Sequence, residues 1–103
     1  MSRSAIPGLY VEAGFNPRRV KVAVSVIRRI PNWILYEIHE FGMWDDLWST
    51  ACIPLLYEDG DLRRLYNAAQ REVYRFLKEV GYRKVRWTNP ATGKVNSIWR
   101  RCL

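Results

Sequence analysis

The sequence has little of the chemistry that enzymes and metalloproteins use. Its 103 residues include two cysteines, Cys52 and Cys102, fifty residues apart, and a single histidine, His39. It contains no CxxC pair, no HExxH motif and no glycine-rich phosphate loop. The adjacent acids Asp45 and Asp46 are typical of a helix N-cap, and a lone histidine is usually structural or merely exposed. We therefore expect no catalytic residue, metal, cofactor or small-molecule substrate.

The sequence also lacks a long apolar run. No stretch reaches the ~20 residues that a membrane-spanning helix needs. The first residues, MSRSAIPG, are polar and turn-prone and do not resemble a signal peptide. Cys52 is expected to be a small core residue and Cys102 a free thiol, which suits a reducing compartment. We expect a cytoplasmic protein without a membrane partner.

Acidic residues are scarce in the C-terminal part of the chain. Residues 62–103 contain eleven Lys or Arg and two acids, a balance of +9, whereas residues 1–61 carry −2. This division suits a polyanion on one side and a protein partner on the other. Solubility alone would explain the total of +7 but not its asymmetry. With 49% hydrophobic residues and five Trp, the chain should fold as a single domain over residues 1–103.

The segment after Asn16-Pro17 fits two structures. Asn16 is a good helix N-cap, and Pro17 suits the first helical position. The run VKVAVSV, residues 20–26, is β-branched and alternates with a period of two, which favours a strand. The same run contributes to a helical stripe that consists of Val20, Ala23, Val24, Ile27 and Ile30. We predict a helix here, with a strand as the alternative.

Prolines divide the next part of the chain into short helices. Pro31 should break or kink the first helix, and a second should cover residues 32–41 and end at Gly42. A third is expected within residues 44–58, started by an aspartate cap and shortened or kinked by Pro54. The second helix should bury Ile34, Leu35, Ile38 and Phe41, and the third places Leu47, Trp48, Ala51 and Leu55 on one face.

The basic region begins with a well-marked amphipathic helix. Asp61 is a good N-cap and Gly81 a good C′ residue, so the helix should lie between them. At about 100° per residue, the basic side chains share one face and the apolar side chains face the other way. The basic face consists of Arg63, Arg64, Arg71, Arg75 and Lys78, with Asn67 and Tyr74 inside it and Gln70 at its edge. The apolar face consists of Leu62, Leu65, Ala69, Val73, Phe76, Leu77 and Val80.

The residues after this helix alternate as strands do. Residues 84–87 and 94–99 alternate, and TNPATG lies between them. An Asn-Pro pair followed by a glycine suits a tight turn, so we predict a β-hairpin over residues 84–99 that turns at Pro90–Gly93. The expected fold class is mainly α: a small helical bundle of three to four helices, with residues 17–80 as its core and a C-terminal β-hairpin.

The basic helix and hairpin carry side chains that suit nucleic acid. Arginines on one helix face can bind phosphates, while Asn67, Gln70 and Arg71 can read base edges. Tyr66, Tyr74, Tyr82 and Trp87 could stack on unpaired bases, although the helical phase assigns Tyr66 to the core and Tyr82 can simply close the helix end. The candidate nucleic-acid-binding residues are Arg63, Arg64, Asn67, Gln70, Arg71, Tyr74, Arg75, Lys78, Arg83, Lys84, Arg86 and Trp87.

Two motifs also carry a family resemblance. They are DDLW, residues 45–48, and LYNAAQREVYRFLK, residues 65–78, joined by a Leu-Leu pair and a short turn. With them, residues 25–84 resemble the second conserved region of bacterial RNA polymerase sigma factors, although Ser49-Thr50 stands where Gln-Glu is usual. The resemblance implies that Asp46, Leu47 and Trp48 bind the polymerase clamp. It also implies that the DNA side, which holds the melted promoter strand, comprises Arg71, Tyr74, Arg75 and Lys78.

The sequence thus predicts a small basic DNA-binding protein related to transcription, similar to the promoter-melting domain of sigma factors. Its expected partners are DNA, single-stranded or melted at a promoter, and RNA polymerase core. Two alternatives stay open. The chain could be a protein–protein interaction module of a mobile element, whose basic face is only solvated. It could also be an RNA-binding module, because basic and aromatic side chains do not separate RNA from DNA.

Overall fold

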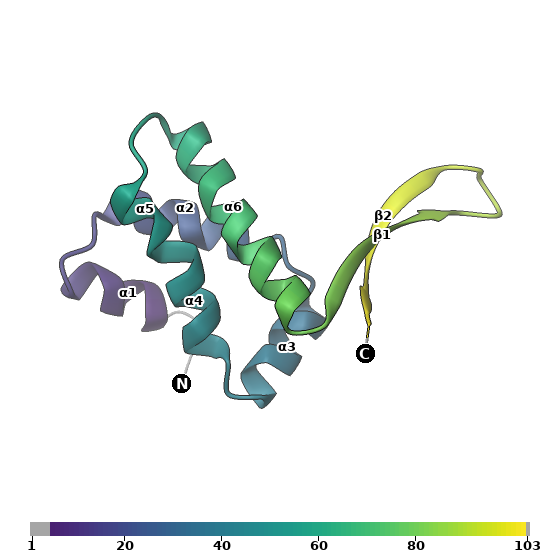
Figure 1. The fold of residues 1–103 in the computed structure, drawn as a ribbon, viewed down its shortest axis with the longest axis horizontal. Coiled ribbons are helices and arrows are strands. Elements are labelled where there is room, and N and C mark those ends of the chain that lie inside the picture. Colours follow the sequence, from purple (N-terminus) through teal and green to yellow (C-terminus); the bar gives the residue numbers. More distant parts are fainter. Residues whose placement is uncertain (1–4, 103) are drawn as a thin grey trace.

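Helices make up most of the molecule, and a two-stranded hairpin follows them (Figure 1). The computed structural model describes residues 5–102. The helices are α1 (Ala5–Glu12), α2 (Pro17–Ile27), α3 (Asn32–Glu40), α4 (Trp44–Cys52), α5 (Pro54–Tyr57) and α6 (Leu62–Glu79), and the strands are β1 (Tyr82–Thr88) and β2 (Val95–Arg101). The predicted class, mainly α with a C-terminal hairpin, is confirmed. The expected bundle is extended by α1, and the proline at position 54 divides off α5.

The N-terminal helix α1 differs from the turn-prone segment that the sequence predicts. Residues 1–4 of that segment lie outside the described residues, and the helix begins at Ala5. Pro7 stands in its first turn, where a missing N–H breaks no helical hydrogen bond. Helix α1 packs on α2. Near its end, the Tyr10 ring lies edge-on to Phe15 at 5.1 Å, and the Tyr10 hydroxyl hydrogen-bonds with Ser49 Oγ at 3.2 Å.

The α2 segment is a helix, as predicted, and not the alternative strand. Asn16 Oδ1 accepts a hydrogen bond from the N–H of Arg18 at 2.9 Å, and Pro17 is the first helical residue. Helix α2 contacts α1, α4 and α6, so more than one of its sides is covered. This explains the strand-like alternation, because Val22 and Val26 lie off the predicted stripe and are nevertheless buried. The buried residues of α2 are Val20, Val22, Ala23, Val26 and Ile27.

Helix α3 confirms most of its predicted buried face. Ile34, Leu35 and Ile38 are buried, but the prediction that Phe41 is buried is wrong, because its side chain is 55% exposed. The helix ends at Glu40, and Gly42 follows with a φ of +70°, so the chain turns away before position 41 can continue the stripe. The guanidinium of Arg101 lies over the Phe41 ring, 5.3 Å from its centroid.

Helices α4 and α5 are divided at the proline. Helix α4 begins at Trp44 and receives no side-chain cap, so the predicted aspartate N-cap is wrong. Asp45 and Asp46 instead occupy the first turn, where negative charge favours the helix dipole. Helix α4 ends at Cys52, and Pro54 opens α5, as its missing N–H allows. Leu47, Trp48, Ala51 and Leu55, which the sequence places on one face, are all buried.

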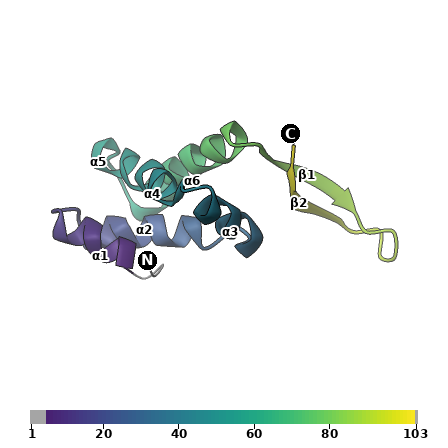
Figure 2. The same ribbon diagram turned by 90° about the horizontal axis from the view of Figure 1, so that it is seen from below.

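Helix α6 has the predicted bounds and phase. Asp61 Oδ1 accepts a hydrogen bond from the N–H of Arg64 at 2.9 Å, and Gly81 follows the helix with a φ of +106°. Leu65, Ala69, Val73 and Leu77 are buried, as predicted, while Phe76 is only half-buried. The core lies where α6 meets α2 and α4. Figure 2 shows α1 and α2 on one side of this helical body and α6 on the other.

The hairpin projects away from the helical body (Figures 1 and 2). Strands β1 and β2 pair antiparallel, with Val85 opposite Ile98, and the turn is closed by a hydrogen bond from the N–H of Asn89 to the carbonyl of Lys94 at 2.8 Å. Gly93 has a φ of +69°, the left-handed conformation that the predicted turn requires. The predicted hairpin is confirmed, and its strands extend two residues beyond the predicted bounds at each end.

Candidate nucleic-acid interface

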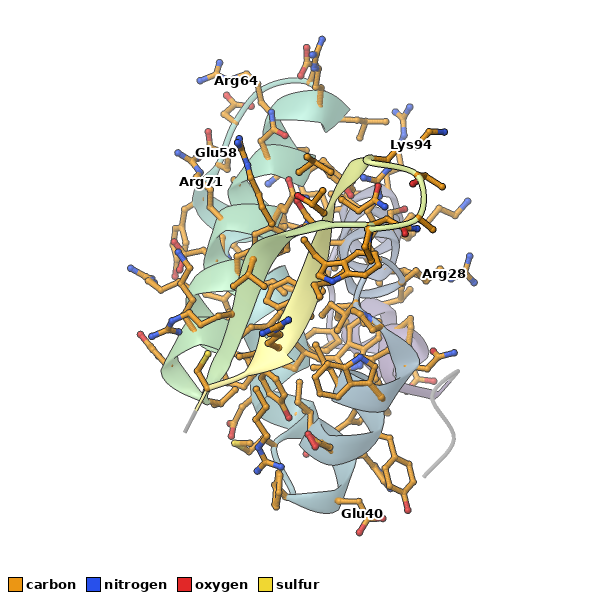
Figure 3. The ribbon with its side chains drawn as sticks, turned by 90° about the vertical axis from the view of Figure 1, so that its right-hand side faces the viewer. Arg28, Glu40, Glu58, Arg64, Arg71 and Lys94 are labelled. Atoms are coloured by element: carbon orange, nitrogen blue, oxygen red, sulfur yellow. The ribbon has the colours of Figure 1, made fainter. Side chains whose placement is uncertain are left out.

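The basic residues of α6 lie on one exposed face. Arg63, Arg64, Arg71, Arg75 and Lys78 are all exposed, as is Asn67, while Gln70 is half-buried. Figure 3, in which the hairpin faces the viewer, shows Arg64 and Arg71 pointing outward on one flank and Lys94 at the hairpin turn. The helical phase that sequence analysis assigns to this face is confirmed.

The five basic side chains of α6 differ in their neighbours. Arg75 forms an ion pair with Glu72, and Arg64 lies 3.9 Å from a carboxylate oxygen of Glu58. Arg63, Arg71 and Lys78 form no ion pair within residues 5–102. The charges of these three are therefore the most available to an anionic ligand.

One border of the basic face is acidic. An open hollow of about 440 Å³ lies between α4 and α6. Its lining includes the carboxylates of Asp46, Glu72 and Glu79, with Arg75 as the basic residue among them. Arg75 therefore faces carboxylates, and the outward basic surface is better represented by Arg71 and Lys78.

The hairpin carries basic residues without acids. Strands β1 and β2 with their turn contain six Lys or Arg and no Asp or Glu. One of the six is paired, because Arg101 Nη1 lies 3.1 Å from Glu37 Oε2 of α3. Glu37 Oε1 also accepts a hydrogen bond from the Tyr82 hydroxyl at 3.1 Å. Glu37 thus connects α3 to both strands, a role that sequence analysis missed because the partners stand 45 and 64 positions away.

The hairpin has two different faces. Residues directly opposite in an antiparallel pair share a face, and successive residues alternate. The inner face, which turns toward the helices, consists of Tyr82, Lys84, Arg86 and Thr88 on β1 and Val95, Ser97, Trp99 and Arg101 on β2. The outer face consists of Arg83, Val85 and Trp87 on β1 and Asn96, Ile98 and Arg100 on β2.

The inner face meets α6 at Tyr74. Tyr74 is half-buried, and its ring lies 5.3 Å from that of Trp99 in an edge-on contact. The Tyr74 hydroxyl accepts hydrogen bonds from Gln70 Nε2 at 3.2 Å and from Lys84 Nζ at 3.4 Å. Lys84 Nζ also lies over the Tyr74 ring, 5.3 Å from its centroid. The structure thus brings together three of the predicted site residues, Gln70, Tyr74 and Lys84. Because Tyr74 packs against the hairpin, less of its ring is free to stack on a base than the sequence predicts.

The other aromatic candidates differ in exposure. Tyr66 packs against the core, as predicted, under the guanidinium of Arg29. Tyr82 is 1% exposed and cannot stack on a base, so that prediction is wrong. Trp87 is 38% exposed on the outer face of the hairpin. Sequence analysis missed Trp33, which is 44% exposed on α3 and lies edge-on to the Tyr82 ring at 5.7 Å.

The predicted partner-binding residues of α4 need correction. Leu47 is 0% and Trp48 3% exposed, so both belong to the core and offer no surface to a polymerase clamp. Asp46 is exposed at the hollow between α4 and α6. The physical reason is the helical phase, because the side of α4 that bears Leu47 and Trp48 is covered by α2 and α6.

The described residues contain little else that suggests chemistry. Residues 5–102 hold no group of three or more His, Cys, Asp or Glu that could bind a metal ion. His39 is exposed, with its ring edge-on to Trp44 at 6.3 Å. Cys52 is buried and Cys102 exposed, and neither forms a disulfide. Burial raises the pKa of the Cys52 thiol to about 11, so at neutral pH it is protonated and a poor nucleophile.

None of the described helices combines the length and apolar character needed to cross a bilayer. Comparisons of the chain with protein-family models, with curated proteins and with solved structures found no match. The sigma-like interpretation therefore stays a prediction that rests on the two sequence motifs.

Proposed function

We propose that this protein binds DNA through a basic surface that combines the exposed face of α6 with the hairpin. The observation that supports this proposal is the local excess of unpaired positive charge. Of the eleven basic residues in this half of the chain, Arg64, Arg75 and Arg101 make ion pairs, and the other eight make none within residues 5–102. Such a surface attracts phosphates, and binding gains from the release of their counterions.

The two parts of the surface suit different contacts. Helix α6 has 18 residues and therefore extends over roughly 27 Å at ~1.5 Å per residue, enough to lie along a groove. Its exposed Asn67 and Arg71 are side chains that form bidentate hydrogen bonds with base edges. The hairpin adds basic side chains that suit phosphate contacts, which position a protein on DNA without reading sequence.

The sigma-factor resemblance adds a more specific proposal. In it the DNA is a promoter, the site holds a melted strand, and RNA polymerase core is the partner. A clamp contact through α4 would have to use Asp46 and its exposed neighbours, because the adjacent Leu47 and Trp48 are buried. A role on DNA would place the protein in the cytoplasm, where reducing conditions suit its two free cysteines.

A salt series tests DNA binding. Anisotropy is measured with labelled single-stranded, bubble and duplex DNA, and the logarithm of the affinity should fall linearly with the logarithm of salt concentration. Arg71→Ala should flatten this slope by about 0.9 on duplex, the loss of one phosphate contact. Arg75→Ala should change it less, because Glu72 already balances that charge.

Arg28→Ala is the matched control for Arg71→Ala, because it removes the same charge from the opposite flank (Figure 3). It should leave the slope unchanged. Weak binding that does not respond to salt, equal for all three probes, would mean that the basic face is only solvated and that the DNA-binding proposal is wrong. An equal or stronger response to matched RNA probes would favour the RNA-binding alternative.

A protein-interaction function has one observation in its favour. The corner around α5 exposes several large apolar side chains, which are Ile53, Leu56, Tyr57 and Leu62. Tyr57 is 83% exposed, and contiguous exposed apolar surface is typical of protein contacts. The double variant Leu56→Asp, Tyr57→Asp tests this candidate. It should no longer bind a protein that the unmodified chain captures, while its DNA affinity should be unchanged.

A further inference from the structure

The outer face of the hairpin places two arginines directly opposite each other. Arg83 on β1 pairs with Arg100 on β2, and both side chains are exposed. Like charges at directly opposite positions destabilise a strand pair unless an anion lies between them. Neither arginine forms an ion pair within residues 5–102, and the hairpin contains no carboxylate that could serve. The arrangement favours an external anion.

Arg83 is held in place for such a ligand. Its Nη1 donates to the carbonyls of Lys78 at 2.9 Å and of Tyr82 at 3.1 Å, which fixes the guanidinium at the C-terminal end of α6. A guanidinium has five N–H donors, so others stay available after these two contacts. The Arg100 guanidinium has no hydrogen bond to a described residue, so this long side chain can adjust from the facing strand. A fixed arginine beside an adjustable one suits the oxygens of a phosphate.

The same face continues from charge to an aromatic ring. Val85 and Ile98, both half-buried, follow the arginine pair, and Trp87 lies beyond them, opposite Asn96. Trp87 stands four residues from Arg83, roughly 13 Å along the strand at ~3.3 Å per residue. Within residues 5–102, Trp87 has no ring contact, whereas Trp99 on the inner face packs on Tyr74. A chain that follows this strand would meet phosphate-binding groups first and a stacking surface next.

We propose that the outer face of the hairpin binds single-stranded nucleic acid, with a backbone phosphate at Arg83 and Arg100 and an unpaired base stacked on Trp87. This assignment rests on the proposed nucleic-acid function and gives it a ligand: unpaired nucleotides, bound on the hairpin part of the proposed surface. The choice of a single strand follows from Trp87. A tryptophan ring stacks on the flat face of a base, and in a duplex the neighbouring base pairs cover those faces.

The test compares Trp87→Ala and Arg100→Ala on a labelled oligothymidylate and on a duplex of the same length. Trp87→Ala should weaken oligothymidylate binding about tenfold and change duplex affinity less than about twofold. Trp87→Phe keeps an aromatic face and should retain most of the affinity. Arg100→Ala should weaken oligothymidylate binding and flatten its salt dependence by about 0.7, the value for one contact to a single strand.

Two controls separate the proposals. Trp33→Ala removes a tryptophan of similar exposure, 44% against 38% for Trp87, from α3 and should leave oligothymidylate binding unchanged. Arg71→Ala should weaken duplex binding more than Trp87→Ala does. If no probe binds in a salt-dependent way, the proposed function itself is wrong. If the probes bind but Trp87→Ala weakens both equally, or Trp87→Phe loses as much as Trp87→Ala, the outer-face proposal is overturned while DNA binding stands. Folding of each variant is checked by circular dichroism.

Discussion

The helical body and the hairpin are built on opposite principles. Of the residues whose burial the structure describes, all the buried ones except Tyr82 belong to the helical body, and all ten acids of the chain lie before the hairpin. The hairpin contributes a single buried side chain, Tyr82, and its charged residues are all basic. The body therefore supplies the apolar burial that stabilises the fold, whereas the hairpin supplies charge and exposed aromatic surface.

The difference means that stability and ligand binding should respond to different substitutions. The contacts that attach the hairpin to the body include the buried Tyr82 side chain, the Glu37 carboxylate and the Tyr74–Trp99 ring pair. A two-stranded hairpin is marginal by itself, so these contacts matter for its order. Substitutions can weaken the helical body, the contacts that attach the hairpin, or the outer face of the hairpin. The expected effects on stability decrease in that order.

The largest effect is expected in the body. Leu47→Ala should lower the free energy of unfolding by about 3–4 kcal/mol, because it removes a fully buried side chain and leaves a cavity. Leu56→Ala is the matched control, since Leu56 is 49% exposed, and it should cost less than about 1 kcal/mol. Urea denaturation followed by circular dichroism measures both. Equal stability of the two variants would contradict the burial of α4.

The two cysteines sharpen the same contrast chemically. With its pKa raised from 9.0 to about 11, Cys52 has roughly a hundredfold less thiolate than an ordinary thiol at pH 8, and burial blocks reagents as well. Native protein should react with Ellman's reagent at Cys102 alone, and at both residues after unfolding. Because the folded-state pKa of Cys52 is raised, its contribution to stability is complete below pH 9 and is lost as pH rises toward 11. Fast labelling of Cys52 in native protein would contradict this.

The attachment should show an intermediate effect. Glu37→Gln removes the ion pair with Arg101 and weakens the hydrogen bond from Tyr82, so it should cost about 1 kcal/mol. The loss should appear as faster amide hydrogen exchange in β1 and β2 with little change in α6. Glu40→Gln, an exposed carboxylate on the same helix, is the control and should leave exchange unchanged. Faster exchange throughout the molecule would mean that the hairpin is not a separate unit.

The smallest effect is expected at the outer face of the hairpin. Trp87→Ala should change the free energy of unfolding by no more than about 0.5 kcal/mol, because little of its side chain packs against the body. Trp48→Ala, in the core, should cost about 3–5 kcal/mol. Thermal melts compare the two tryptophans directly. A large loss of stability for Trp87→Ala would show that the hairpin contributes to the core. Its roles in stability and in ligand binding could then not be separated.

The sequence allowed a good prediction wherever the signal is local. The caps at Asn16 and Asp61 and the glycine at position 81 each act on the adjacent few residues, and all three behave as predicted. The phase of α6 follows from its own periodicity, and the turn at Pro90–Gly93 sets the hairpin register. The same register places Arg83 opposite Arg100, so this pair follows from the sequence once the turn is known.

Predictions failed where the outcome depends on distant contacts. The motif that contains Leu47 and Trp48 fits both a core helix and a docking helix, because an apolar stripe does not say what covers it. Phe41 follows its helical stripe in sequence, but the chain turns at the end of α3 and exposes it. Glu37 gave no local signal of its role, because its partners lie on strands formed much later in the chain.

By itself, then, the sequence determined the helices from α2 to α6, the existence of the hairpin and the concentration of positive charge in one half, since backbone hydrogen bonding, capping and periodicity are short-range. The tertiary structure alone decided which apolar side chains are buried and which charges are neutralised. It joined Arg101 to Glu37 of α3, while it left Arg71 and Arg100 without an acidic partner among the described residues. The Arg75–Glu72 pair, three residues apart in α6, follows instead from local helical spacing. Burial, and ion pairing between residues far apart in the sequence, depend on what the rest of the chain places nearby, which no local pattern records.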